Sequence, residues 1–359
     1  MTNALPFSDH VAGADRKTLI LSDRDVERLL PMNECIEVMD QALRTLATGN
    51  AILPLRSILR LPPHGSPNAF GLMPSVLTEG EGEDARATAV GAKIITVFPS
   101  NDATPYDSHI GVVLLFDAEH GRLRAIMDAS SITAIRTAAV SGLATRLLAR
   151  PDATDLAILG SGIQAMSHLD AMRCVRDISR VRVWSRTPTR ARKFATRATA
   201  RFGCPVEVCE TAQQAVDGAS IICTVTAART PILLGAWIAP GTHINAVGSS
   251  IASARELDTD AVKRAYVYVD RRESALAEAG DLLIPMREGA ITEAHIRGEI
   301  GELLLGQAAG PEHTDNITIF KSLGIAVEDL ASAQHLYTRA VATETGTSVS
   351  IGGIRHDDA

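Results

Sequence analysis

The sequence predicts an α/β fold, in which a doubly wound parallel sheet is joined to a second domain of the α+β type. Three observations lead to this prediction. Residues 155 to about 250 alternate short apolar strands with helical segments, the pattern of a parallel sheet covered by helices. A glycine-rich turn connects the first of these strands to the first helix. The longer apolar strands that precede this region are joined by a tight turn and not by a helix.

The first part of the chain contains a helix, then strands, then a second helix. We expect a helix at 28–48, a loop at 61–75, buried strands at 91–98 and 110–117, a hairpin return at 122–128 and a helix at 131–149. The first helix is indicated by Ile36, Met39 and Leu43, which share one face at helical spacing. Pro151 ends the second helix, because proline cannot continue the backbone hydrogen bonding.

The pattern after Pro151 is strand and helix in turn. We expect a strand from 155, a helix to about 176, a strand at 181–186, a helix to about 201, strands at 206–209, 220–226 and 243–250, and a last amphipathic helix from 325. The last helix follows the nucleotide-type region, so we expect it to pack back on the first domain. The predicted domains are therefore 1–135 with 325–359, and 136–324.

Composition narrows the class of protein. The 359 residues are 46% hydrophobic and 21% charged, as in a globular protein with a sizeable core. A net charge of -7 argues against nucleic acid and anionic membranes as partners. The N-terminus lacks the apolar segment of a signal peptide, and no apolar run approaches the roughly 18 residues of a membrane span. Five cysteines without a CxxC pair indicate a reducing, cytoplasmic location, and Cys204 with Cys209 lacks the second pair that a metal site needs.

The glycine-rich turn is "ILGSGIQA", residues 158–165. Gly160 suits the tight turn, Gly162 allows the backbone to approach a pyrophosphate, and Ala165 takes the place of the third glycine. Ile163 and Gln164 begin a helix whose N–H groups and dipole favour phosphate. A bare structural turn is the alternative, but the strand and helix on either side favour a Rossmann dinucleotide-binding domain.

The end of the next strand selects the nucleotide. An NAD site usually has an acidic residue there, whereas this chain has Ser185, Arg186, Thr187 and Arg190. Hydroxyls and guanidinium groups suit a 2′-phosphate, so NADP(H) is favoured and NAD(H) remains open; a solvated helix start is the alternative. Residues at the following strand ends, Thr226, Ala227 and Val247, are further candidates for cofactor contact.

Two buried segments carry an unexpected positive charge. Arg136 lies on the otherwise apolar helix "ITAIRTAAVSGLA", where a cation is costly without an anion, either a ligand or a protein carboxylate in a structural ion pair. Lys93 interrupts the apolar strand "GAKIITVF", where it either extends to an edge or takes part in chemistry, since burial lowers a lysine pKa.

The stretch "INAVGSSIASARELD", residues 244–258, ends a strand in a turn of small residues. Active sites of α/β proteins lie at such strand ends. Ser249 and Ser250 follow the strand, and no carboxylate occurs until Glu256.

The chain resembles the ornithine cyclodeaminase/mu-crystallin family over nearly its whole length. The resemblance rests on "LPLRSIL", "GAKIITVFPSN", "SHIGVVLLFDAEHGRLRAIMDASSITAIRTAAVSGLAT", "ILGSGIQA", "VWSRT", "HINAVGS", "RELD" and "IFKSLGIAVEDLASA", in that order. It implies a homodimer, in which the domain 1–135 with 325–359 dimerises and contributes substrate groups. The Rossmann domain 136–324 would hold NAD(H) or NADP(H).

The resemblance also implies roles for individual residues. Arg56 and Arg136 match the arginines that clamp a substrate α-carboxylate, although Arg56 alone could be a surface cation. Lys93 matches the lysine near the substrate carbonyl or imine. The remaining matches are Ser108 and His109 near the cofactor, Lys321 and Ser322 closing over it, and Glu278 at the border of the substrate pocket.

Ser250 is where the chain departs from the cyclodeaminases. Aligned on "NAVG", it occupies the position of their acid/base aspartate, and a serine cannot serve as that base. The reductase members of the family also lack the aspartate. We therefore expect an NAD(P)H-dependent reductase of small cyclic 2-imino carboxylates, with Δ1-pyrroline-2-carboxylate and Δ1-piperideine-2-carboxylate as first candidates. Lys93 would supply or position the proton, and Ser250 would orient a water or the imine, or merely cap a helix.

Three other functions remain open at this point. The first two are an ornithine cyclodeaminase and an alanine- or opine-type amino-acid dehydrogenase. The third, of another class, is a non-catalytic protein that binds NADPH and a small ligand, as the mu-crystallin branch of the family implies.

Overall fold

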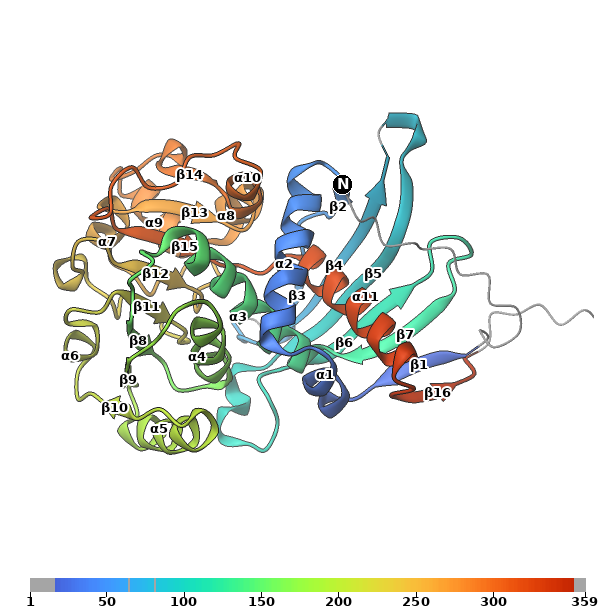
Figure 1. Cartoon of the computed structure of the whole chain (residues 1–359), viewed down its shortest axis with the longest axis horizontal. Helices are drawn as coiled ribbons and strands as arrows, with labels where there is room; N and C mark the ends of the chain where they lie inside the picture. Colours follow the sequence, from blue (N-terminus) through green and yellow to red (C-terminus); the bar gives the residue numbers. More distant parts are fainter. Residues whose placement is uncertain (1–16, 64, 81, 352–359) are drawn as a thin grey trace, which may run out of the picture.

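Two sheets and the helices between them form the molecule, as Figure 1 shows. The computed structural model describes residues 17–63, 65–80 and 82–351. The prediction about a signal peptide concerns residues that lie mostly outside the described ones. Among the described residues, no helix has both the length and the apolar character to cross a membrane.

One sheet is entirely parallel and has the strand order β10-β9-β8-β11-β12-β15-β13-β14. Its strands are β8 (Asp155–Leu159), β9 (Arg180–Trp184), β10 (Val206–Val208), β11 (Ile221–Thr224), β12 (His243–Ala246), β13 (Tyr266–Val269), β14 (Ile296–Glu299) and β15 (Thr318–Lys321). The order reverses between β8 and β11, which creates the crevice where α/β proteins bind ligands. This is the predicted doubly wound sheet.

Helices cover both faces of this sheet. They are α4 (Ile163–Val175), α5 (Pro188–Phe202), α6 (Ala212–Val216), α7 (Thr259–Lys263), α8 (Arg272–Glu278), α9 (Gly280–Arg287) and α10 (Ile300–Leu304). The central strands β8, β11, β12, β13 and β15 are buried along almost their whole length, as a sheet covered on both faces requires.

The second sheet is mixed and has the order β16-β1-β7-β6-β5-β4-β2, with β3 paired to β4. Its strands are β1 (Thr18–Leu21), β2 (Ala51–Ile52), β3 (Ser57–Arg60), β4 (Ala69–Glu79), β5 (Arg86–Val97), β6 (His109–Phe116), β7 (Leu123–Asp128) and β16 (Thr347–Val349). β16 pairs with β1, so this last strand of the described residues belongs to the second sheet.

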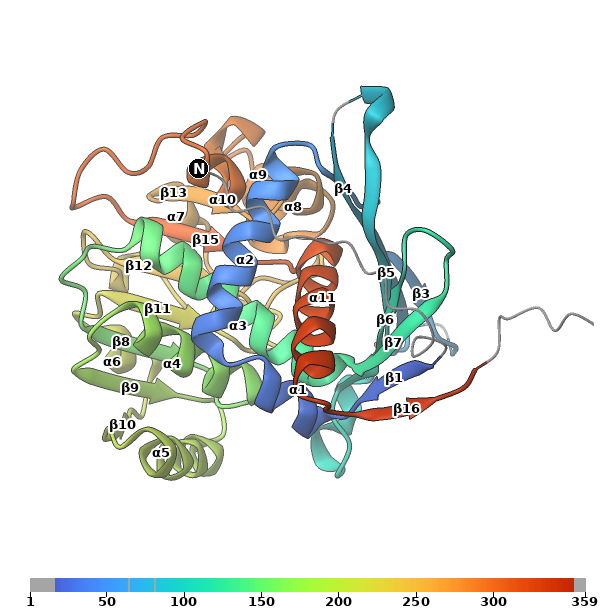
Figure 2. The same ribbon diagram turned by 45° about the vertical axis from the view of Figure 1, so that its right-hand side comes forward.

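Four further helices lie between the sheets: α1 (Asp23–Leu29), α2 (Met32–Ala47), α3 (Ala129–Leu148) and α11 (Ala326–Ala342). Figure 2 shows α11 along the inner face of the second sheet, with α2 beside it on the side away from that sheet, and α11 also contacts α3. The predicted packing of the last helix on the first domain is therefore present. The predicted boundary at residue 136 falls inside α3, which runs without interruption from the end of β7 to the region before β8.

Two predictions about individual segments are wrong. The helix predicted at 28–48 is two helices, because Pro31 sits at the N-cap of α2 and the chain breaks there. The segment 61–75 is not a loop throughout, since β4 begins at Ala69 and contains Pro74. Pro74 lies between the stretches of β4 that pair with β3 and with β2, so its missing N–H costs no hydrogen bond on that side.

Candidate active site

The turn after β8 has the geometry of a phosphate-binding loop. Gly160 has a φ of 132°, and a side chain there would come within 2.7 Å of the Val225 carbonyl oxygen. Gly162 caps α4 without a side-chain hydrogen bond, and the space beside its Cα is open. The N–H groups of the first turn of α4 therefore lack a capping side chain, and these residues fit the pyrophosphate of a dinucleotide.

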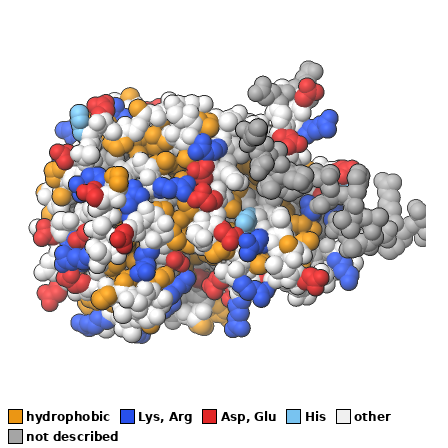
Figure 3. Space-filling view, in the orientation of Figure 1, with side chains coloured by type: hydrophobic (Ala, Val, Ile, Leu, Met, Phe, Trp, Pro, Cys, Tyr) orange, Lys and Arg blue, Asp and Glu red, His pale blue; other side chains and the backbone are white. Residues whose placement is uncertain are grey.

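The end of β9 lies beside this loop. The Ser161 hydroxyl donates to the Ser185 hydroxyl at 3.0 Å. Arg186 and Arg190 are exposed, and Thr187 caps α5 without using its hydroxyl as a cap. The structure thus brings the residues predicted to choose the nucleotide next to the glycine-rich turn. On the face shown in Figure 3, Lys and Arg side chains gather at the lower left, where α5 lies.

The Glu256 carboxylate holds the loop that follows β12 in place. Its buried carboxylate accepts hydrogen bonds from the Thr226 N–H at 2.7 Å, the Thr226 hydroxyl at 2.6 Å and the Gly248 N–H at 2.7 Å. Burial, and then the nearby Asp281 charge, raise the pKa of Glu256. The first carboxylate after the strand therefore returns to the strand end, but both of its oxygens clamp the loops after β11 and β12. The Thr226 side chain is engaged in this clamp as well.

The prediction that Lys321 closes over the cofactor needs a correction. Its side chain is fully buried, with the ammonium 3.0 Å from the Asp281 carboxylate and 3.1 Å from the Ala246 carbonyl oxygen. Ser322 is buried as well. Because protein groups enclose the ammonium, it serves as an internal ion pair that anchors α9 to the sheet. Sequence alone could not identify its partner, 40 positions away.

Arg56 joins the two halves of the molecule. It follows β2 in the chain, yet its guanidinium pairs with the Glu278 carboxylate at the end of α8 and lies 3.4 Å from the carbonyl oxygens of Leu323 and Ser250. The interpretation of Arg56 as a surface cation is wrong, since its side chain is 18% exposed and paired. Ser250 is not a helix cap either, because the next helix, α7, begins at Thr259 and is capped by Asp258.

Lys93 lies on the face of β5 that is turned toward α11 and is buried. Its ammonium is 2.8 Å from the Asp329 carboxylate and 3.4 Å from the Thr133 hydroxyl. The Thr133 carbonyl oxygen in turn accepts from the Gln164 amide at 3.4 Å, which connects Lys93 to the helix of the glycine-rich turn. Burial and then the Arg136 charge lower the pKa of Lys93 to about 8, while Asp329 opposes that shift.

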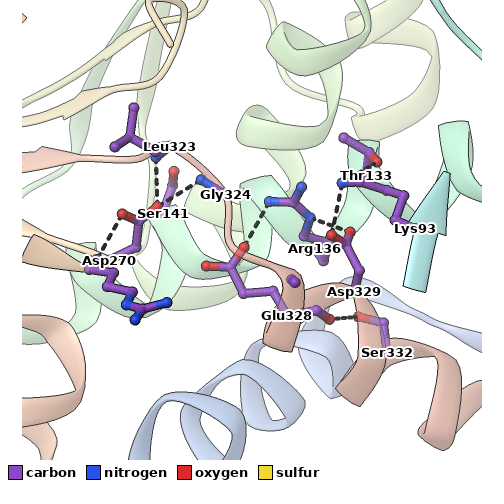
Figure 4. A network of polar contacts seen from close by, with 12 residues as sticks. Lys93, Thr133, Arg136, Ser141, Asp270, Leu323, Gly324, Glu328, Asp329 and Ser332 are labelled. Atoms are coloured by element: carbon purple, nitrogen blue, oxygen red, sulfur yellow. Dashed lines mark hydrogen bonds and ion pairs between the residues drawn. The ribbon is translucent and has the colours of Figure 1, made fainter. Parts of the chain in front are cut away.

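Arg136 projects from α3 between two acidic residues, as Figure 4 shows. Its Nε donates to Asp329 at 2.9 Å and its Nη1 donates to Glu328 at 2.7 Å, and all three side chains are buried. The structural ion pair considered for Arg136 is therefore present. Its Nη2 makes no hydrogen bond to any residue that the structure describes, so the role of Arg136 toward a substrate stays a prediction.

The loop after β15 is held against this guanidinium. The buried Asp270 carboxylate accepts from the N–H groups of Leu323 at 2.6 Å and Gly324 at 2.7 Å. Gly324 has a φ of 74°, and a side chain there would overlap the Arg136 guanidinium. Glycine is therefore required at position 324, both by the positive φ and by the lack of space beside the Arg136 guanidinium. Gly324 also lines a small pocket, together with Arg56, Glu278 and Met73.

His109 is the first residue of β6, and Ser108 directly precedes it. The Ser108 hydroxyl is 2.9 Å from His109 Nδ1. The surrounding protein and then the positive charge of Lys93, with smaller effects from Arg56 and Arg136, lower the pKa of His109. Lys93 on β5, Arg136 on α3 and Arg56 in the loop between β2 and β3 therefore all lie close enough to His109 to affect its pKa. Such an arrangement can bind an organic anion and move a proton.

Five further side chains of this site were not identified from the sequence: Thr133, Asp270, Asp281, Glu328 and Asp329. The adjacent Glu328 and Asp329 occupy the first turn of α11, where acidic residues favour any helix. The one sequence feature that points to them is the presence of two acidic residues at an otherwise apolar helix start. This feature is inconspicuous, because acidic residues are common in the first turn of any helix.

The fold and site define a dinucleotide-binding α/β protein whose second sheet brings buried cations to the nucleotide crevice. Comparison with known proteins agrees. The model of the ornithine cyclodeaminase/mu-crystallin family matches residues 16–344. The chain belongs to this family.

Three relatives illustrate the similarity. Ketimine reductase mu-crystallin of Mus musculus is 43% identical over 289 residues, 80% of this chain and 85% of the relative. A structure of Thermococcus litoralis Δ1-pyrroline-2-carboxylate reductase in complex with NADH and L-proline matches with a TM-score of 0.87 and 38% identity, covering 92% of this chain and 100% of that one. An archaeal alanine dehydrogenase dimer with bound NAD matches with a TM-score of 0.85 and 30% identity, covering 94% and 100%.

Proposed function

We propose that the protein is an NAD(P)H-dependent reductase of small cyclic 2-imino carboxylates, forming products such as proline or pipecolate. The observation that carries the proposal is the connection from Lys93 through Thr133 to Gln164, which ties the buried cations to the phosphate-binding turn. The similarity to a ketimine reductase and to a pyrroline-2-carboxylate reductase supports the substrate class.

Each residue has a task in this reaction. A bound NAD(P)H would supply hydride from its nicotinamide, and residues 160–164 would hold the pyrophosphate of the dinucleotide. Arg56 and Arg136 orient the substrate carboxylate from two sides, which fixes the imine carbon toward the cofactor crevice. Lys93 carries a proton close to neutral pH and keeps the imine nitrogen protonated, so that the carbon accepts hydride. The Ser250 turn supports Arg56 through its backbone carbonyl.

The proposal is tested by following NADPH and NADH consumption with cyclic ketimines, with 2-oxo acids plus ammonia, and with ornithine. Steady oxidation with a cyclic ketimine is the expected result. Turnover of pyruvate with ammonia only would indicate an alanine dehydrogenase instead. Release of ammonia from ornithine would indicate a cyclodeaminase, and binding without turnover would indicate a ligand-binding protein.

NADP(H) is the favoured cofactor, although the similar solved structures hold NADH or NAD. Replacing Arg186 with alanine should weaken NADPH binding by about 1.5–3 kcal/mol, the worth of a charge-assisted hydrogen bond, and should change NADH binding much less. Only NADPH carries the 2′-phosphate. Dissociation constants from titration of both cofactors check this. Arg197→Ala removes an exposed charge farther along α5 and serves as control; equal losses for both cofactors in Arg186→Ala would remove Arg186 from this role.

A homodimer is the proposed assembly. Figure 2 shows the outer face of the second sheet on the side away from α11, where no described helix covers it. That face is apolar and half-buried or exposed, and includes Leu72, Val90, Ile94, Ile110, Val112 and Leu114. Apolar faces of this kind in single chains indicate protein contacts. The dimer of the similar archaeal alanine dehydrogenase supports the same assembly.

A charge on this face should separate the subunits. Ile94→Lys should raise the dimer dissociation constant by about tenfold or more, because two ammonium groups would be buried without partners. Light-scattering masses across a dilution series measure it. Val341→Lys, on an exposed position of α11, should leave the mass unchanged. A monomeric unmodified protein would contradict the assembly.

The proposed location is the cytoplasm. All five cysteines are free, which is the state that a reducing compartment maintains.

A further inference from the structure

Two consecutive residues of α11 place carboxylates on one guanidinium, but they are not equivalent. Asp329 is shared, since one oxygen lies 2.9 Å from Arg136 Nε and the other lies 2.8 Å from the Lys93 ammonium. Among the described residues, Glu328 forms an ion pair with Arg136 alone, through one oxygen at 2.7 Å, and the backbone of Ile325 interacts with its carboxylate as well and lowers its pKa. Its other oxygen, Oε1, is buried and has no hydrogen-bond partner among the described residues. Figure 4 shows this asymmetry around Arg136.

With all four side chains ionised, the charges of this cluster balance before any substrate arrives. Lys93 and Arg136 contribute two positive charges, and Glu328 and Asp329 contribute two negative charges when both are ionised. All four side chains are at most 4% exposed, so solvent screens them poorly. A substrate carboxylate at Arg136 would be the third anion on the two cations. Like charges held this close favour protonation of one member.

Glu328 is the member that can accept the proton. Asp329 contacts both cations, and their charges hold its pKa below its usual value despite burial. Burial raises the pKa of Glu328 to about 8, and Asp270 and Asp329 add to the effect while Arg136 opposes it. Cys35 of α2 also faces the pair, but burial raises its pKa further still, so it remains a neutral thiol. The orphaned Oε1 is an atom where a proton can reside.

We propose that Glu328 takes up a proton from solvent when the carboxylate of a substrate or product reaches Arg136, so that the cluster exchanges one negative charge for another. Glu328 is then a positioning residue that acts through Arg136 and makes the site accept an anion at a buried cation. The inference rests on the proposed function, because it requires a carboxylate ligand at Arg136. Its consequence is that ligand affinity falls as the pH rises above the Glu328 pKa.

The test uses the full-length protein with bound cofactor and L-proline as the ligand. At about pH 9, binding should generate the infrared band of a protonated carboxylic acid, since Glu328 is then mostly ionised in the free site. The band should be absent in Glu328→Gln and shifted in Glu328→Asp, which retains a carboxyl group and guards against loss of fold. Lys93 titrates in the same range but cannot produce this band. L-Proline affinity of the unmodified protein should fall by up to about tenfold per pH unit above the Glu328 pKa.

The outcomes separate the two proposals. Absence of both L-proline binding and ketimine reduction would overturn the proposed function and this inference with it. Ketimine reduction and L-proline binding without the carboxylic acid band would overturn only the inference. A band of unchanged size and position in Glu328→Asp and Glu328→Gln would assign the proton to another carboxylate and overturn it as well.

Discussion

Replacing Lys93 with methionine is expected to lower kcat for ketimine reduction by about 10²–10⁴-fold, the usual contribution of a positioned acid or base. Methionine fills a similar volume, so the β5 strand and its contacts with α11 should persist. Asp329 keeps one cationic partner, Arg136, which limits the structural cost. Steady-state kinetics at saturating ketimine and NADPH measure the change.

The pH profile distinguishes this role from a packing effect. Lys93 has a pKa of about 8 and must be protonated to act as an acid, so kcat/KM of the unmodified protein should fall as the pH rises through that value. Lys93→Met should lack the fall that belongs to this group. Lys263→Met, an exposed lysine on α7, is the matched control and should behave like the unmodified protein. A Lys93→Met enzyme with full kcat would exclude Lys93 from proton transfer.

Replacing Asp329 with asparagine is expected to destabilise the protein by about 3–5 kcal/mol, the cost of removing one partner from a buried ion pair. The Asp329 side chain is 1% exposed, and its negative charge partly neutralises the charges of Lys93 and Arg136. Asparagine carries no charge and would leave both cations less compensated. Urea unfolding followed by circular dichroism measures the loss. Asp152→Asn removes a 77% exposed carboxylate near Arg150 and should change stability by about 0.5 kcal/mol or less.

The pH dependence of stability gives a second measurement. The folded pKa of Asp329 lies below its ordinary value, so its contribution is present above that ordinary value, about 3.8, and is lost as the pH falls through the folded pKa. Asp329→Asn should therefore show a shallower loss of stability in acid than the unmodified protein. Identical acid unfolding of the two proteins would mean that the carboxylate is not held by these cations.

The nucleotide half of the fold could be predicted because its signals are local. The strands β8, β9, β11 and β12 are short segments rich in buried apolar residues, mostly separated by helices, and each is recognisable within about ten residues of chain. Gly160 and Gly162 are also recognisable from the neighbouring sequence, since a phosphate-binding turn between a strand and a helix uses glycines at these positions. The sequence also singled out Lys93 and Arg136, because a charge is conspicuous inside an apolar segment.

The tertiary structure decides which groups these charged side chains contact. Arg136 meets its carboxylates 192 and 193 positions later in the chain, and Arg56 meets Glu278 at a separation of 222. Such partners leave no periodicity or spacing to detect, and an acidic residue at a helix start or strand end has local explanations of its own. Lys321 is an example. Its family motif suggested a contact with the cofactor, whereas the fold buries its ammonium against the Asp281 carboxylate. The sequence by itself determined which elements form and which charges need partners. Only the three-dimensional packing determined the partners, because a buried charge is stabilised by whichever opposite charge the fold brings within a few ångströms, regardless of distance along the chain.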